Sequence, residues 1–179
     1  MPSLLTPVSA SDPGVSSSQG NSVATIKRTG VIDLPREQVW RVLGDFGAIA
    51  SWAPNVDHSC LLTECTEGVG AVRRIQSGRV TLRETVKAWE PGKSLSYMII
   101  GLPSVVRAAT NTWRLDGSGG TTTVTIISEV DCGPRPPQRV IARVVGRRLA
   151  AASEQMISGL TERCEFFASG SDRYEGNTA

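Results

Sequence analysis

The chain has 179 residues, of which 40% are hydrophobic, and this length and composition predict a single domain with a sizeable core. The formal net charge of +2 is too small to indicate a surface that binds nucleic acid. No apolar run approaches the roughly 18 residues of a membrane-spanning helix, so no transmembrane segment is expected.

The two ends of the chain differ in composition from its middle. Residues 1–22 are dominated by Ser, Pro, Gly, Thr and Asp, and residues 169–179 have the same polar character. Such segments cannot bury enough apolar surface to offset the entropy that is lost on ordering. We therefore expect two disordered tails around one folded unit at residues 23–168.

The folded unit is predicted to begin with a strand and two short helices. Residues 23–33 are expected to form the strand. Pro35 then opens a helix at a position where its missing N–H group costs nothing. A second short helix is expected at residues 48–52, ending before Pro54.

Six further strands are expected at the spacing of hairpins. Their turns are marked by Ser77-Gly78, by residues 90–93 and by the glycine-rich residues 116–120. The predicted strands cover residues 56–64, 70–76, 79–89, 94–101, 108–116 and 122–131.

A long amphipathic helix is predicted at residues 136–168. Its apolar residues recur at steps of three or four, which keeps one helix face toward a core. They are Ile141, Val145, Leu149, Ala152, Met156, Leu160, Cys164 and Phe167. One long helix after many strands predicts an α+β domain in which the helix lies across a curved antiparallel sheet.

Short motifs along the folded unit resemble a known superfamily. They are Pro35-Arg36-Glu37-Gln38-Val39-Trp40, Asp45-Phe46, Trp52-Ala53-Pro54, Gly68-Val69-Gly70-Ala71-Val72-Arg73, Glu84, Tyr97, Gly101-Leu102-Pro103 and Trp113. Over residues 26–167 the chain resembles the START-like superfamily, also called SRPBCC, and its bacterial polyketide cyclase/dehydrase-like branch. The resemblance implies a helix-grip fold, with a seven-stranded antiparallel sheet around a long C-terminal helix and an apolar cavity between them. Members bind lipids, sterols, hormones or polyketides, and some cyclise or dehydrate polyketides.

The plant abscisic-acid receptors share the implied fold and carry a Gly-Leu-Pro tripeptide in their gate loop. In this chain Gly101-Leu102-Pro103 follows the fifth predicted strand, whereas the receptor gate joins the third and fourth strands. The receptor latch motif is also missing. A hormone receptor is therefore not predicted.

Glu84 is predicted to point into the core. It alternates with Leu82 and Val86 on the apolar face of its strand. A buried carboxylate needs a partner, and Arg73 on the preceding strand is the expected one. Three interpretations stay open: a polar anchor in an apolar pocket, an acid or base of raised pKa, or an ion pair that only sets strand register.

Other inward residues fit a ligand that is mostly hydrocarbon with one or two oxygens, although they also fit an ordinary core. Trp52 is expected at the mouth of the pocket, and Met156 and Leu160 are expected to face the sheet from the long helix. The predicted ligand-binding residues are Trp52, Glu84, Tyr97, Asn111, Trp113, Met156 and Leu160.

His58 is the only histidine of the chain. Alternation with Val56 and Cys60 allows it to point inward beside Glu84, where the two would form a proton-transfer pair of the kind a cyclase needs. A position soon after Pro54 fits an exposed edge equally well. Glu84 and His58 are thus candidates, and no catalytic residue is assigned.

Basic residues are concentrated in the first half of the long helix. They are Arg135, Arg139, Arg143, Arg147 and Arg148. Basic groups in a first helical turn oppose the helix dipole. Acidic neighbours, a subunit contact or an anionic partner would offset this unfavourable interaction. One hypothesis is therefore peripheral membrane contact through the face that carries Arg139 and Arg143, and the other is a face that is only solvated. The sequence predicts no oligomeric state.

The four cysteines are Cys60, Cys65, Cys132 and Cys164, without a CxxC pair or a companion histidine cluster. This spacing predicts reduced thiols, no metal site and no cofactor. The N-terminus also lacks the pattern of a secretory signal, so a cytoplasmic location is predicted.

We expect a protein that binds a small, largely apolar ligand, such as a lipid or a polyketide, in a cavity between the sheet and the long helix. The alternative is a polyketide cyclase or dehydratase that uses an inward carboxylate or histidine as acid or base. The ligand-binding hypothesis depends on a space beneath the helix.

Overall fold

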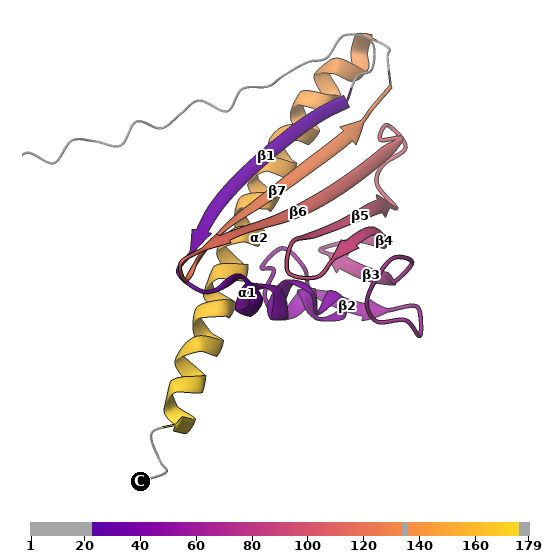
Figure 1. Cartoon of the computed structure of the whole chain (residues 1–179). Helices are drawn as coiled ribbons and strands as arrows, with labels where there is room; N and C mark the ends of the chain where they lie inside the picture. The colour runs from indigo at the N-terminus through magenta and orange to yellow at the C-terminus, as the bar shows by residue number, and fades with distance from the viewer. Residues whose placement is uncertain (1–22, 134–135, 176–179) are drawn as a thin grey trace, which may run out of the picture.

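The computed structural model describes residues 23–133 and 136–175. These residues contain one seven-stranded antiparallel sheet with the order β1-β7-β6-β5-β4-β3-β2 (Figure 1). The strands are β1 (Val23–Ile32), β2 (His58–Leu61), β3 (Val72–Ser77), β4 (Val80–Glu90), β5 (Ser94–Ile100), β6 (Ala108–Ser118) and β7 (Thr121–Asp131). Strands β2 to β7 form a meander, and β1 pairs with β7.

The hairpin between β3 and β4 brings two neighbouring strands into a fixed register. Ser77 pairs with Val80, so Gly78 and Arg79 are the two turn residues. Gly78 has a φ of +58°, which residues with a Cβ rarely adopt. This explains why glycine occupies the first turn position. The register places Arg73 directly opposite Glu84.

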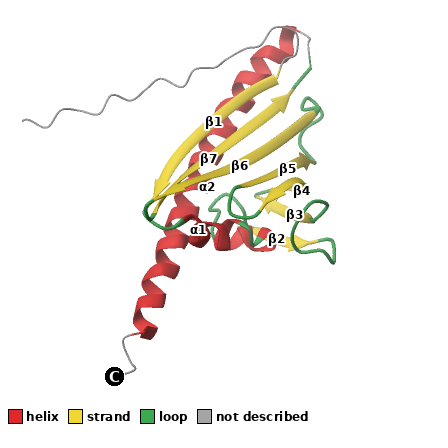
Figure 2. Ribbon diagram, in the orientation of Figure 1, coloured by secondary structure: helices red, strands yellow, loops and turns green. Residues whose placement is uncertain are grey.

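The helices are α1 (Arg36–Leu43), the 3-10 helix η1 (Phe46–Ser51) and α2 (Pro136–Glu175). The two short helices predicted after the first strand are confirmed (Figure 2). Helix α2 is longer than predicted, because it continues past Ala168 to Glu175 into the segment expected to be a tail. The predicted tails at residues 1–22 and 176–179 lie outside the described residues.

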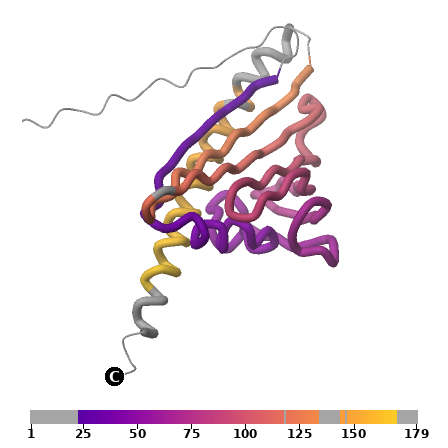
Figure 3. The backbone as a smooth tube through the Cα atoms, viewed as in Figure 1, coloured from indigo at the N-terminus to yellow at the C-terminus, as the bar shows by residue number. Residues whose placement is uncertain are grey.

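Helix α2 lies against β1, β7 and α1 (Figures 1 and 3). Met156, Leu160 and Cys164 of its predicted apolar face are buried. Phe167 was expected on the same face, but its side chain is 50% exposed. The reason is that the C-terminal part of α2 extends beyond the sheet and α1 (Figure 1). None of the described helices is both long and apolar enough to cross a membrane.

Two glycines allow α2 to approach its neighbours closely. A Cβ on Gly30 of β1 would lie 2.5 Å from Cγ2 of Ile157 on α2. A Cβ on Gly159 of α2 would overlap the carbonyl oxygen of Trp52 and lie 2.7 Å from Cδ of Pro54. The Ile157 side chain of α2 therefore packs directly on the β1 backbone, and the α2 backbone at Gly159 packs against the segment that follows η1.

The contact at Gly159 can be tested through stability. Gly→Ala inside a helix normally stabilises by about 1 kcal/mol. We expect Gly159→Ala to lower the free energy of unfolding by about 2 kcal/mol instead, because the added methyl group collides with the Trp52 backbone. Urea denaturation measures the change, and the exposed neighbour Ser158 provides the control Ser158→Ala, which should shift stability by less than about 0.5 kcal/mol. A stabilised Gly159→Ala protein would contradict this packing.

Candidate functional site

The inner face of the sheet carries a buried ion pair. Nε of Arg73 on β3 donates to Oε2 of Glu84 on β4 at 2.5 Å. Both residues are almost fully buried, at 2% and 3% exposure. The inward direction of Glu84 and its partnership with Arg73, both predicted from strand alternation, are confirmed.

The guanidinium of Arg73 is also held by η1. Its Nη1 donates to the carbonyl oxygen of Phe46 at 2.6 Å. Its Cζ lies 3.9 Å from the centroid of the Phe46 ring and 5.0 Å from that of Tyr97. A carboxylate, a carbonyl group and two aromatic faces thus surround a cation that water does not reach, which offsets its desolvation.

A second set of polar groups crosses the sheet beside this ion pair. Tyr97, Asn111 and Ser128 lie directly opposite one another on β5, β6 and β7, and we call them the interior polar row. Nδ2 of Asn111 and Nε1 of Trp113 both donate to the Tyr97 hydroxyl at 3.3 Å. Oγ of Ser128 donates to Oδ1 of Asn111 at 2.7 Å and lies 3.4 Å from Oγ of Ser153 on α2. The row therefore joins the sheet to the helix.

The Tyr97 hydroxyl keeps its proton at neutral pH. Burial raises the pKa of Tyr97, the Glu84 carboxylate raises it further, and Arg73 with the two N–H donors only partly opposes this. Among the described residues, the hydroxyl accepts two hydrogen bonds, but no acceptor for its own proton is found. The group can therefore donate a hydrogen bond to a ligand oxygen.

The predicted ligand-binding residues are all buried, and several contact one another. The rings of Trp52 and Trp113 meet edge to face with centroids 6.1 Å apart. Phe46 packs on Tyr97 with centroids 5.8 Å apart. The set Trp52, Glu84, Tyr97, Asn111, Trp113, Met156 and Leu160 lies in the interior between the sheet, η1 and α2. The side chains expected to line a cavity thus meet across the interior, because wide aromatic rings extend from both sides.

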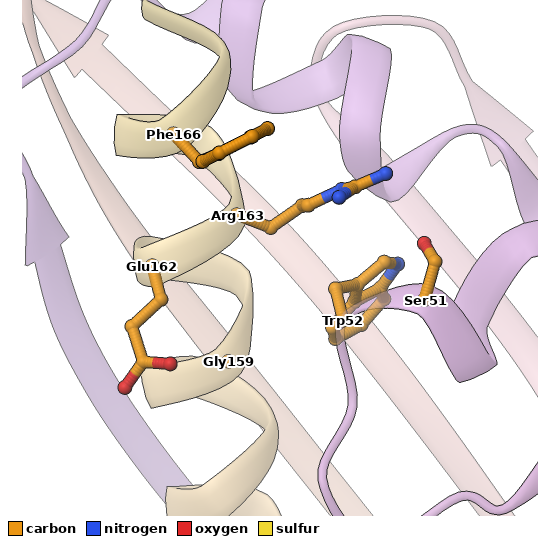
Figure 4. Close-up of a pocket in the computed structure, with 6 residues that line it drawn as sticks. All are labelled: Ser51, Trp52, Gly159, Glu162, Arg163 and Phe166. Atoms are coloured by element: carbon orange, nitrogen blue, oxygen red, sulfur yellow. The ribbon is translucent and has the colours of Figure 1, made fainter. Parts of the chain in front are cut away.

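Two hollows lie at the surface of the part of the chain that the structure describes. The α2 hollow, of about 230 Å³, lies between α2 and the end of η1 (Figure 4) and is lined by Ser51, Trp52, Gly159, Glu162, Arg163 and Phe166. The α1 hollow, of about 410 Å³, is lined by Trp40, Arg41, Gly44, Asp45, Phe46, Thr66, Glu67 and Trp89. Of the predicted ligand-binding residues, only Trp52 lines either hollow.

Of the two positions left open for His58, the exposed edge is the one that the structure shows. His58 is exposed on the edge strand β2 and pairs with Gln76. Ser59 occupies the opposite face, where its hydroxyl donates to the Gly47 carbonyl of η1 at 2.6 Å. The proton-transfer pair of His58 with Glu84 is therefore not formed.

No metal-binding cluster of His, Cys, Asp and Glu is found in the described parts of the chain. The four cysteines are free thiols, of which Cys60 and Cys65 are exposed. Burial raises the pKa of Cys132 and raises that of Cys164 to about 12, so both remain uncharged at neutral pH. An uncharged thiol is a poor nucleophile and a poor metal ligand.

The arginine-rich part of α2 is only partly described. Arg147 and Arg148 are exposed. Arg135 and the side chains of Arg139 and Arg143 lie outside the described residues, so membrane contact through that face stays a prediction.

Sequence reasoning missed several residues that shape the interior. Phe46 covers Arg73, and Ser128 and Ser153 connect the polar row to α2. A signal for Ser128 exists, because it alternates with the buried Ile126 and Val130 on β7. No local signal places Phe46 over Arg73, since the two are far apart in the chain.

A family model described as "Polyketide cyclase / dehydrase and lipid transport" matches residues 23–165, from β1 through most of α2. No curated protein matches the chain significantly.

Several solved structures share the fold. The Zhui aromatase/cyclase from a Streptomyces species is 18% identical, with a TM-score of 0.64 over 80% of this chain and 94% of that one. A START superfamily protein from Mycobacterium smegmatis is 14% identical, with a TM-score of 0.62 over 80% and 98% of the two chains. The di-domain ARO/CYC protein StfQ of the steffimycin biosynthetic pathway is 13% identical, with a TM-score of 0.69 over 82% of this chain and 52% of that one. At these identities the likeness establishes the fold alone.

The buried ion pair predicts strongly coupled mutations. Arg73→Met or Glu84→Leu alone should lower the free energy of unfolding by about 3–5 kcal/mol, because either change leaves one buried charge without a partner. The double variant should be more stable than either single variant, and chemical denaturation of all four proteins measures this. The exposed pair of Arg28 with Glu154 is the control, where Arg28→Met should cost less than about 1 kcal/mol. Additive losses at Arg73 and Glu84 would contradict the proposed coupling.

Proposed function

The chain belongs to the family of polyketide cyclases, dehydrases and lipid-transport proteins. We therefore propose that it binds a small, largely apolar molecule with one or two oxygen atoms. The ligand lies between the sheet and α2, where it contacts the interior polar row and the aromatic rings around it. A lipid or an aromatic polyketide has this chemistry.

The observation that carries the proposal is the polar chemistry of the interior. Buried polar groups lower stability unless each is satisfied, and apolar residues of the same size would fill a structural core at less cost. Here Tyr97 has a proton to donate, and it belongs to the same apolar core as Trp52, Trp113, Met156 and Leu160. One donor in an apolar, aromatic environment suits a ligand that is mostly hydrocarbon with an oxygen at one end.

Access to this interior requires movement of η1. Phe46 and the residue after its last turn, Trp52, place their rings over Arg73 and against Trp113. The same two residues form part of the α1 and α2 hollows, respectively. Displacing η1 from the sheet would therefore join both hollows to the interior. This movement would break the hydrogen bond from the Ser59 hydroxyl to the Gly47 carbonyl of η1.

The cyclase or dehydratase alternative has less support from the geometry. The Glu84 carboxylate forms an ion pair with Arg73, and the His58 side chain is exposed. Catalysis by Glu84 would require the ion pair to open when the ligand enters. The enzyme would be favoured if the protein converts a bound ligand and Glu84→Gln abolishes this turnover without abolishing binding.

The Tyr97 hydroxyl provides the test of binding. We expect 1-naphthol to shift the indole N–H resonance of Trp113 in the NMR spectrum, and Tyr97→Phe to weaken this binding about fivefold to tenfold, which is the loss of one hydrogen bond of about 1 kcal/mol. Binding of 1-methylnaphthalene, which has a methyl group in place of the hydroxyl, should not change in this variant.

Thr112→Val is the matched control, because the Thr112 hydroxyl is bonded to Ser96 away from the polar row. It should leave the affinity for 1-naphthol unaltered. Equal losses for both ligands in Tyr97→Phe, or no response of Trp113 to either ligand, would refute an interior site anchored by Tyr97.

A further inference from the structure

The α2 hollow contains a cation that no carboxylate neutralises. Among the described residues, no Asp or Glu oxygen lies within ion-pair distance of Arg163. Figure 4 shows its guanidinium reaching from α2 toward Ser51 and Trp52, whereas the carboxylate of Glu162 points away. The contacts found for the guanidinium are the faces of Phe166 and Phe167, with Cζ 5.9 and 4.5 Å from their centroids. Its positive charge is therefore available to a ligand.

Trp52 supplies a second donor to the same hollow. Its side chain is 93% buried, since 7% of its surface is exposed, yet its Nε1–H group has no hydrogen-bond partner in the described structure. A buried donor without an acceptor costs about 1–3 kcal/mol. In Figure 4 this nitrogen is on the side of the indole that faces Ser51 and the Arg163 guanidinium. An acceptor bound in the hollow would satisfy it.

Size and charge indicate which acceptor fits. The hollow of about 230 Å³ is lined by Arg163, Trp52 and Ser51, with the exposed ring of Phe166 at its rim. One positive charge matches a group with one negative charge better than a doubly charged phosphate. The apolar rim suits a hydrocarbon chain attached to that group.

We propose that the α2 hollow is a surface site for the carboxylate of an amphipathic organic acid, held by Arg163, Trp52 and Ser51. The site lies outside the interior polar row, so it does not require η1 to open and stands independently of the function proposed above. The acid's hydrocarbon chain lies along Phe166.

Octanoate is the probe that tests the site. Titration of the ¹⁵N-labelled protein should shift the indole N–H resonance of Trp52, identified by its loss in Trp52→Phe, in a saturable manner. Arg163→Gln should weaken octanoate binding at least about tenfold, as expected for a charge-assisted hydrogen bond to a carboxylate. Arg147→Gln removes the same charge from an exposed position on the same helix and should leave the affinity unchanged.

Three further ligands and one variant define the chemistry. Octanol, which lacks the charge, and acetate, which lacks the chain, should both bind more weakly than octanoate, and octyl phosphate should bind no more tightly. Tyr97→Phe should leave octanoate binding intact, which separates failure here from failure of the interior site. The proposal is overturned by the absence of a saturable Trp52 shift, by equal effects of Arg163→Gln and Arg147→Gln, by octanol or acetate matching octanoate, or by tighter binding of octyl phosphate.

Discussion

The buried guanidinium of Arg73 imposes the requirement around which the interior is arranged. A cation without access to water must have its charge and its N–H groups satisfied by protein groups. Glu84 provides the opposite charge from the neighbouring strand, and the Phe46 carbonyl provides an acceptor from η1. Because one acceptor is part of the η1 backbone, any displacement of η1 leaves a buried donor unsatisfied. The Arg73 guanidinium therefore holds η1 against the sheet.

This arrangement makes η1 the wall of the interior. Its first residue, Phe46, lies over Arg73, and Trp52 at its end packs against Trp113. Helix α2 closes the other side, where Gly159 allows close approach to the Trp52 backbone. A single short segment thus lies between both surface hollows and the polar row.

Two regions of different chemistry lie on the two sides of Trp52. On the inner side, Tyr97 offers one neutral donor within an aromatic surface, which suits an alcohol, phenol or ketone oxygen. On the outer side, Arg163 offers a charge at the solvent boundary, which suits an acid. The indole ring of Trp52 contacts Trp113 and also lines the α2 hollow, so it separates the two regions. The helix-grip fold brings these side chains together, and their chemistry differs on the two sides of Trp52.

Patterns local to the chain were sufficient to predict most of the architecture and part of the candidate site. Strand alternation identified Glu84, Tyr97 and Trp113 as inward residues, and a two-residue turn was enough to name Arg73 as the partner of Glu84. For His58 alternation left two orientations open, because β2 spans only His58–Leu61, too short a strand at the sheet edge to establish which face is inward. Phe167 follows the helical period, but that period carries no information on where the sheet ends.

Local sequence patterns are enough to predict the order of the elements, the long amphipathic helix and the inward polar residues, because periodicity and turn chemistry act between residues close in the chain. Other contacts arise only in the folded protein: Phe46 covers Arg73, Trp52 meets Trp113 and Arg163 reaches toward Ser51. Each of these contacts depends on how η1 and α2 sit against the sheet. That placement results from side-chain packing among residues distant in sequence, which no local pattern encodes.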